Sequence, residues 1–362
     1  MSAASGGAGA DIAAFDLGFI MLRRPPILQR RASSVLAALF ILTCSPGSAG
    51  ADTWADRLGY PADSKVLILH ADELGLSYET NAAGAKLLES GAVRSAAAMV
   101  PAPWFADFAQ WSKAHPDVDV GLELTLNSEL QNYRWQSVTS EELVPSLVDA
   151  EGFLCRTPLQ TTANASADEV EYELRAQIAR AKAAGLRPTH LTSHLGTLFE
   201  RPDLIDVYLR IARQEWIPAA IVRLTAEQLD HFIQEGNPVP DDVLMALDEY
   251  PLPKLDALRF VLDADTYDAK KQALLAMIAE LGPGITQIEF RPAVPSDALP
   301  RMVDDAQQRI WDAELLADQE IIRALQAEGI VLTDWREIMR RFSGEAPANA
   351  EKPAAVNAPT EQ

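Results

Sequence analysis

Three carboxylates and an imidazole stand at the ends of three strand-like segments. Asp72 and Glu73 are adjacent at the end of "VLILHADELG". Glu123 lies within "GLELTL", and His194 follows "HLTS". Adjacent carboxylates repel unless a positive charge lies between them, and a glutamate among leucines is costly to bury alone. Because carboxylates and imidazoles are common ligands of divalent ions, the pattern indicates a metal site, with zinc or magnesium as the expected ion.

A permanent cation is expected at the same place. The segment "IEFRPA" puts Glu289 and Arg291 on one face of a strand, with Arg291 at its end. Arg291 stays charged, so it can stabilise an oxyanion but cannot act as a proton donor. An ion pair with Glu123, or a positive charge among the carboxylates in place of an ion, is an open alternative.

Each residue also has a structural interpretation when it is taken alone. Asp72 or Glu73 by itself would be a turn or cap residue in most proteins. His70 and His190 are expected to fill the core. The functional interpretation rests on the common position of the acidic residues and His194 at one rim.

The elements that must position these residues alternate between strand and helix. Strand patterns cover residues 66–72, 93–100, 119–126, 189–196, 219–225, 256–263, 284–293 and 330–335. The clearest helical patterns cover residues 167–184, 202–215, 266–281 and 302–327. Most strands are apolar enough for burial on both faces, which indicates a parallel sheet, and eight such strands close a barrel. We therefore predict an α/β fold, a single-domain TIM-like (β/α) barrel of regular or irregular form, in preference to an open doubly wound sheet.

The predicted barrel indicates where the catalytic residues should lie. Catalytic residues of such barrels lie at the carboxyl ends of the strands, where Asp72 and His194 fall. No glycine-rich phosphate-binding motif follows a strand, which weakens a nucleotide-binding alternative. Residues 127–165 are predicted to be an insertion after the third strand.

Both ends of the chain differ from the middle. Four arginines between residues 23 and 31 precede the apolar run "VLAALFIL" and a small-residue stretch that ends at Ala51. This pattern predicts a signal peptide over residues 1–51, with Met21 as an alternative start. The apolar run is too short for a stable membrane span, so we expect a periplasmic or secreted protein. A lipoprotein anchored at Cys44 is the less favoured alternative.

Residues 343–362 lack apolar periodicity, which predicts a disordered tail after a barrel domain over residues 52–342. The net charge of −21 argues against nucleic acid as a partner, because nucleic-acid binding needs a basic face.

The order of several motifs resembles one family. "ILHADELGLSYETNAA", "GAVRSAAAMVPAPWF", "DVGLELTLNSE" and "PTHLTSHLGTLF" are similar to segments of the YdjC-like carbohydrate deacetylases. That family includes chitooligosaccharide deacetylases and resembles hopanoid-synthesis deacetylases. The resemblance runs from about residue 60 to residue 215 and continues more weakly to "FRPAVPSDAL". It implies a TIM-like barrel and metal-dependent removal of an acetyl group from an N-acetylated sugar.

The resemblance also implies roles for single residues. The family's A-D-D-F/L-G motif falls on Asp72, as the general base, and on Glu73, as a metal ligand. Its G-[LV]-H-L-T motif puts Glu123 where a histidine ligand is usual, and its S-H motif falls on His194. The late H-P motif falls on Arg291, which therefore replaces a histidine.

Two hypotheses follow. The first is a hydrolase in which Glu73, Glu123 and His194 hold the metal and Asp72 and Arg291 are catalytic. In this hypothesis Tyr133, Arg134 and Trp135, in the insertion, bind the carbohydrate substrate. The alternative is a degenerate barrel that binds a carbohydrate or envelope ligand without turnover. Metal-dependent phosphodiester cleavage on a similar barrel is a third, less favoured class.

Overall fold

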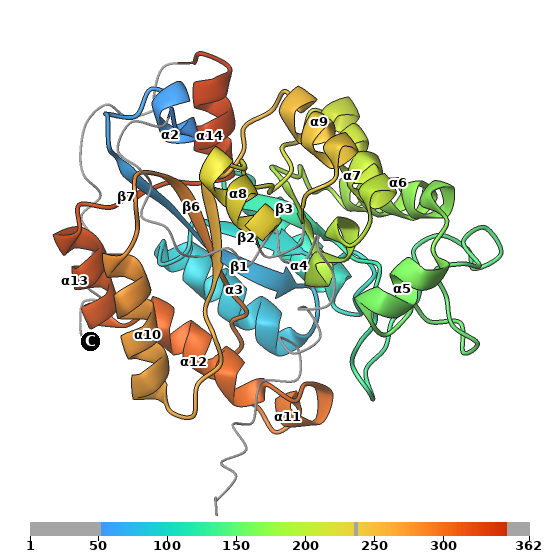
Figure 1. Cartoon of the computed structure of the whole chain (residues 1–362). Coiled ribbons are helices and arrows are strands. Elements are labelled where there is room, and N and C mark those ends of the chain that lie inside the picture. The colour runs from blue at the N-terminus through green and yellow to red at the C-terminus, as the bar shows by residue number, and fades with distance from the viewer. Residues whose placement is uncertain (1–51, 235–237, 346–362) are drawn as a thin grey trace, which may run out of the picture.

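The computed structural model describes residues 52–234 and 238–345 (Figure 1). The predicted signal peptide, and the predicted tail beyond residue 345, lie outside the described residues. Among the described helices, none is both long and apolar enough to cross a membrane.

A curled sheet of parallel strands forms the centre of the molecule. Its strands are β1 (Lys65–Leu74), β2 (Ser95–Ala98), β3 (Asp119–Leu124), β4 (Leu191–Ser193), β5 (Ala257–Phe260), β6 (Gly284–Phe290) and β7 (Val331–Leu332). Six of them follow the order β4-β3-β2-β1-β6-β5. β7 pairs with the start of β1, whereas β2 pairs with the end of β1. β1 is therefore central, and its carboxyl end lies in the middle of the sheet edge.

The predicted strand over residues 219–225 is not a regular strand. Leu191 forms an isolated parallel bridge with Ala219, and Val222 forms another with Leu255. Between these bridges the chain bends, because the N–H of Ile221 donates to the carbonyl of Ala219 at 2.8 Å. The first half of the segment therefore meets β4, and the second half meets the residues before β5.

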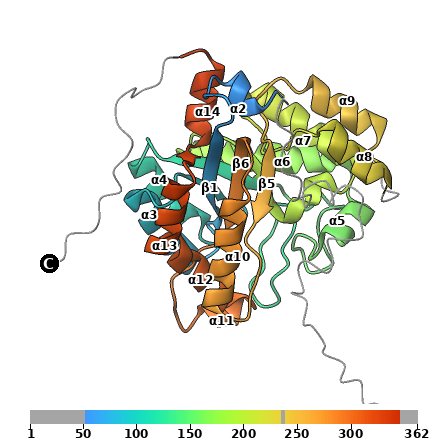
Figure 2. The same ribbon diagram turned by 60° about the vertical axis from the view of Figure 1, so that its left-hand side comes forward.

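The fold prediction is confirmed in its parallel strands and its outer helices. The regular ladder of the described residues curls part of the way around, and the two isolated bridges connect its edges. Helices α6 to α9 lie on one side of the molecule, and α10, α12 and α13 lie on the other (Figures 1 and 2).

The helices match the predicted patterns except near the C-terminus. They are α2 (Trp54–Arg57), α3 (Tyr78–Ser90), α4 (Phe105–Ala114), α5 (Pro158–Asn164), α6 (Ala167–Ala183), the 3-10 helix η2 (His194–Phe199), α7 (Pro202–Glu215), α8 (Ala226–Gln234), α9 (Asp241–Glu249), α10 (Tyr267–Ala279), α11 (Leu299–Met302), α12 (Ala306–Leu316), α13 (Gln319–Ala327) and α14 (Trp335–Phe342). The single helix predicted over residues 302–327 is interrupted twice. Val303 is extended, and Asp318 caps α13 by accepting the N–H of Glu320.

Aromatic and imidazole rings pack together in the core beside the sheet. The rings of His70 and His190 make an edge contact at 5.0 Å, and His190 stacks on Trp335 at 5.4 Å. Gly121 is required beside them, because a Cβ atom there would lie 2.5 Å from the His190 carbonyl oxygen. The prediction that His70 and His190 are core histidines is confirmed, since both are buried.

Candidate active site

The first strand delivers Asp72 and Glu73 to the carboxyl edge of the sheet. The register between β1 and β2 shifts between Ala71 and Leu74, so the two acidic residues lie in an irregular stretch. Glu73 has a φ of 61°, in the left-handed region that costs a non-glycine residue roughly 1–3 kcal/mol. Its backbone N–H donates to Glu123 Oε2 at 2.9 Å, which ties the end of β1 to β3.

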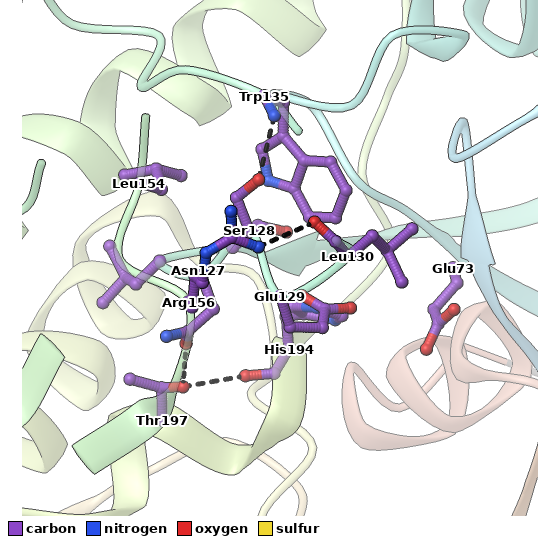
Figure 3. A network of polar contacts seen from close by, with 12 residues as sticks. Glu73, Asn127, Ser128, Glu129, Leu130, Trp135, Leu154, Arg156, His194 and Thr197 are labelled. Carbon is purple, nitrogen blue, oxygen red and sulfur yellow. Dashed lines mark hydrogen bonds and ion pairs between the residues drawn. The ribbon is translucent and has the colours of Figure 1, made fainter. Parts of the chain in front are cut away.

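The third and fourth strands bring Glu123 and His194 together. His194 begins η2 directly after β4, and its Nδ1 lies 2.6 Å from Glu123 Oε1. Its Nε2 lies 3.1 Å from Oε2 of Glu129, which follows β3. We refer to Glu123, Glu129 and His194 as the histidine cluster. Figure 3 shows Glu129 beside His194, with Glu73 lying apart from both.

His194 is the positively charged member of the histidine cluster. Burial alone would lower the pKa of His194, but Glu129 and Glu123 raise it well above its ordinary value. Burial would raise the pKa of Glu129, but His194 holds it below the usual value. Burial and the charge of Asp72 raise the pKa of Glu123, although the neighbouring His194 opposes this shift.

A second group of charged side chains holds the carboxylate of Glu73. Arg309, on α12, places its guanidinium 2.6 Å from Glu73 Oε2, and that of Arg291 lies 3.9 Å from Oε1. Asp305 connects the two arginines, at 2.6 Å from Arg309 and 2.9 Å from Arg291. We refer to Glu73, Arg291, Asp305 and Arg309 as the arginine cluster.

Backbone contacts fix the position of α12 beside the sheet. The N–H of Arg291 donates to Asp312 Oδ2 at 3.0 Å, and the N–H of Ala293 donates to the Arg309 carbonyl at 3.1 Å. Asp312 is also paired with the buried amine of Lys270 at 2.5 Å. The loop after β6 and the helix that carries Arg309 are therefore held together.

Asp72 is an ionised carboxylate that precedes Glu73 of the arginine cluster in the chain and interacts electrostatically with Glu123 of the histidine cluster. Burial would raise its pKa, but His70 and the neighbouring Glu123 and His194 hold the pKa below its usual value. His70 Nε2 is 3.8 Å from Asp72 Oδ1, too far for a direct hydrogen bond. Among the described residues, Asp72 Oδ1 is a buried oxygen without a hydrogen-bond partner. This oxygen is available to accept a proton.

Two of the predicted substrate-binding residues are structural. Trp135 is only 3% exposed, so its ring is not available to stack on a sugar; it contacts the ring of His194 at 6.3 Å. Arg134 donates to the backbone of Ser128 and Leu154 and pairs with Asp149 at 2.6 Å. Arg134 therefore holds the insertion together, and its side chain is not directed to a ligand.

Exposed aromatic rings lie on the neighbouring side of the site. Tyr78 and Trp104 are 55% and 39% exposed, and their rings make an edge contact at 5.8 Å. Both follow the end of a strand, because Tyr78 begins α3 after β1 and the N–H of Trp104 donates to the Gly75 carbonyl. The predicted Tyr133 is half-buried beside them, with its hydroxyl donating to the Leu76 carbonyl.

The predicted ligands Glu73, Glu123 and His194 share one region, but their donor atoms do not converge. Within residues 52–234 and 238–345, no three His, Cys, Asp or Glu side chains are grouped so that they could hold a metal ion. The carboxylate of Glu73 is paired with Arg309, and both nitrogens of His194 face carboxylates. As arranged, this donor set does not fit the predicted zinc or magnesium ion.

Three residues of the site were missed by the sequence reasoning. Glu129 lies in the segment predicted as an insertion, and Asp305 and Arg309 lie in the segment predicted as one long helix. The only local signal for the last two is their spacing of four residues, which is a common surface ion pair on helices.

Comparisons with known proteins identify the same family as the order of the motifs in the sequence. Residues 66–327 match the family described as YdjC-like protein. A carbohydrate deacetylase from Thermus thermophilus is 34% identical over 293 residues, which cover 78% of this chain and 97% of the relative. A carbohydrate deacetylase from Thermoanaerobacter pseudethanolicus is 25% identical over 273 residues, covering 75% and 98%.

A solved structure supports the fold. It belongs to a protein from Enterococcus faecalis V583 described as a candidate for cellobiose-phosphate cleavage. The two are 24% identical and superpose with a TM-score of 0.62 over 76% of this chain and 99% of that chain. At this identity the likeness shows the fold alone. The family match covers residues 66–327, and a relative above 30% identity is matched along nearly its whole length, so this chain belongs to the YdjC-like family.

Proposed function

We propose that the protein is a carbohydrate deacetylase, a hydrolase that cleaves the amide C–N bond of an N-acetylated sugar. Family membership supports this, because relatives along most of the chain are named carbohydrate deacetylases. The observation that carries the proposal is Asp72, an ionised carboxylate with an unpaired buried oxygen, at the strand ends where barrels place their chemistry.

Asp72 has the properties of the general base. It accepts a proton from water while the water oxygen forms a bond to the acetyl carbon. The proton then passes to the amide nitrogen as the C–N bond breaks, which releases acetate and the amino sugar. Since one carboxylate serves as base and then as acid, no second proton donor is needed.

Arg291 is suited to stabilise the oxyanion of the tetrahedral intermediate. Its side chain is 26% exposed, whereas that of Arg309 is only 3% exposed. A substrate can therefore reach Arg291 but not Arg309. Asp305 holds Arg291 in place, and a fixed donor requires little reorganisation as negative charge develops.

The exposed rings of Tyr78 and Trp104 are proposed to bind the sugar. Apolar sugar faces pack on exposed aromatic rings, and these two follow the strands whose ends carry the site. They take the role that the sequence assigned to Trp135, which is buried.

The experiment is an assay of acetate release from N-acetylated chitooligosaccharides. The wild-type protein should release acetate, and Asp72→Asn should not. Asp268→Asn, which makes the same change at an exposed position of α10, is the matched control. Absence of acetate with all N-acetylated oligosaccharides, with and without added divalent metal, would contradict the proposal.

A second candidate function is carbohydrate binding without turnover. The pairing of Glu73 with Arg309 favours it, because this carboxylate is neutralised within the protein. Oligosaccharide binding measured by tryptophan fluorescence, together with an absence of acetate release, would select this candidate.

We further propose that the protein is periplasmic or secreted. The proposal is supported by the arginines, the apolar run and the small residues that precede residue 52. Sequencing the N-terminus of the mature protein tests it: cleavage near Ala51 supports export, and retention of residues 21–51 contradicts it.

A further inference from the structure

The arginine cluster differs from a metal site in how it neutralises Glu73. We propose that the Arg309 guanidinium takes the electrostatic place of a divalent ion in this chain, so that the site works without a resident metal. The inference rests on the proposed function for what the site does, but it is measured by metal binding, which does not require turnover.

Glu73 is the predicted metal ligand on the first strand, and each of its carboxylate oxygens faces a guanidinium group. Oε2 is 2.6 Å from Arg309, and Oε1 is 3.9 Å from Arg291. A metal ion bound to Glu73 would have to displace a guanidinium that is almost completely buried. Displacement would remove one of the two carboxylates that compensate the buried charge of Arg309, which is unfavourable.

Arg309 is held where it is by contacts that do not involve Glu73. Asp305, one helical turn earlier, lies 2.6 Å from its Nε, and its backbone carbonyl accepts the N–H of Ala293 at 3.1 Å. The guanidinium is therefore positioned by α12 and the loop after β6. A divalent ion is mobile and can be removed, whereas this cation is part of the fold.

The other two predicted metal ligands, Glu123 and His194, belong to the histidine cluster and are paired with each other. Both nitrogens of His194 face carboxylates, at 2.6 Å from Glu123 and 3.1 Å from Glu129. To bind a metal, His194 would have to turn one of its nitrogens away from these partners. Asp72 is then the acid of the site that neither cluster holds by a close ion pair.

The test compares zinc and manganese binding by the wild-type protein and by variants at Arg309. Metal content after dialysis is measured by mass spectrometry, and each metal is titrated calorimetrically. We expect the wild-type protein to retain no stoichiometric metal. Arg309→Met, which frees Glu73 with little change in volume, should bind zinc at least about tenfold more tightly, a difference of roughly 1.4 kcal/mol.

Two further variants sharpen the comparison. Arg309→Lys keeps the positive charge and should remain free of metal. Arg301→Met removes an exposed arginine on the neighbouring α11 and should behave as the wild type. If Arg309→Met does not fold, the wild-type titration and the effect of a chelator on wild-type thermal stability decide the question.

Three results would overturn the inference. They are one tightly held metal per wild-type chain, a chelator-induced fall in the wild-type melting temperature, and a folded Arg309→Met protein without any gain in zinc affinity. Failure of the proposed function looks different, because it is an absence of acetate release with or without metal. A metal-free protein that releases acetate in the presence of chelator supports both.

Discussion

The arginine cluster and the histidine cluster hold their carboxylates with different cations. In the first, Glu73 and Asp305 face guanidinium groups, which stay charged throughout the physiological pH range. In the second, Glu123 and Glu129 face an imidazole, whose charge depends on a bound proton. Buried carboxylates are therefore neutralised by a permanent cation in the arginine cluster and by a titratable cation in the histidine cluster.

This difference assigns separate tasks to the two clusters. The arginine cluster includes Arg291, the proposed oxyanion-stabilising group, and is expected to be insensitive to pH. The histidine cluster is expected to respond to pH and contacts the insertion through Trp135. Asp72 precedes Glu73 and interacts with Glu123 and His194, so variants of either cluster can be compared through the proposed base.

The largest expected effect comes from removing the base that both clusters flank. Asp72→Asn should lower the rate of acetate release by about 10²–10⁴-fold, because general base catalysis contributes that much. Initial rates at saturating oligosaccharide measure the effect. A variant within twofold of the wild-type rate would show that another group accepts the proton.

A large stability effect is expected in the arginine cluster. Arg309→Met leaves Glu73 and Asp305 buried without their main cation, which should lower the free energy of unfolding by about 3–5 kcal/mol. Urea denaturation measures the change. The double variant Glu73→Gln/Arg309→Met should recover part of the loss, and Arg301→Met should stay within about 0.5 kcal/mol of the wild type. Equal losses in the single and double variants would show that Glu73 is not the partner that matters.

A pH dependence on the alkaline side is expected from His194 in the histidine cluster. Because the folded-state pKa of His194 is raised, its contribution to stability is fully present below about pH 6.5 and is lost as the pH rises through the raised value. The wild-type free energy of unfolding should therefore decrease on the alkaline side of about pH 6.5. The decrease should be smaller in His194→Gln and unchanged in Arg301→Met. Identical slopes in wild type and His194→Gln would contradict the charge assigned to His194.

The smallest expected effect tests the exposed rings outside both clusters. Trp104→Ala should raise the KM for an N-acetylated oligosaccharide about tenfold with little change in kcat, because stacking contributes equally to the ground and transition states. Tyr172→Ala removes another exposed ring, on α6, and is the control. A fall in kcat without a change in KM would assign Trp104 to the chemistry rather than to sugar binding.

Parallel strands made much of the site predictable. The carboxyl ends of such strands share an edge, so the pattern was sufficient to bring Asp72, Glu73, Glu123 and His194 into one region. The alternative in which Arg291 supplies positive charge among the carboxylates agrees with its position 3.9 Å from Glu73, but Arg309 is the closer partner at 2.6 Å. The alternative ion pair between Arg291 and Glu123 is wrong, because Glu123 is paired with His194. No local pattern could identify Arg309, because its contact with Glu73 joins residues far apart in the sequence.

The insertion shows where pattern reasoning is weakest. Tyr133, Arg134 and Trp135 form an aromatic and cationic group that is typical of sugar binding, yet Trp135 is buried and Arg134 binds backbone carbonyls. Burial of a loop residue depends on what packs over it. The exposed pair of Tyr78 and Trp104 belongs to two different strand ends and meets only in three dimensions.

The sequence by itself determined the family, the parallel strands and the position of Asp72 at the end of the first strand. These follow from local periodicity and from motif order, which a linear chain records. Only the tertiary structure decided which cation each carboxylate faces, because a charge contact depends on distances of a few ångströms between distant segments. In this protein that decision places Arg309, in a helix near the end of the fold, beside the acid that the first strand delivers.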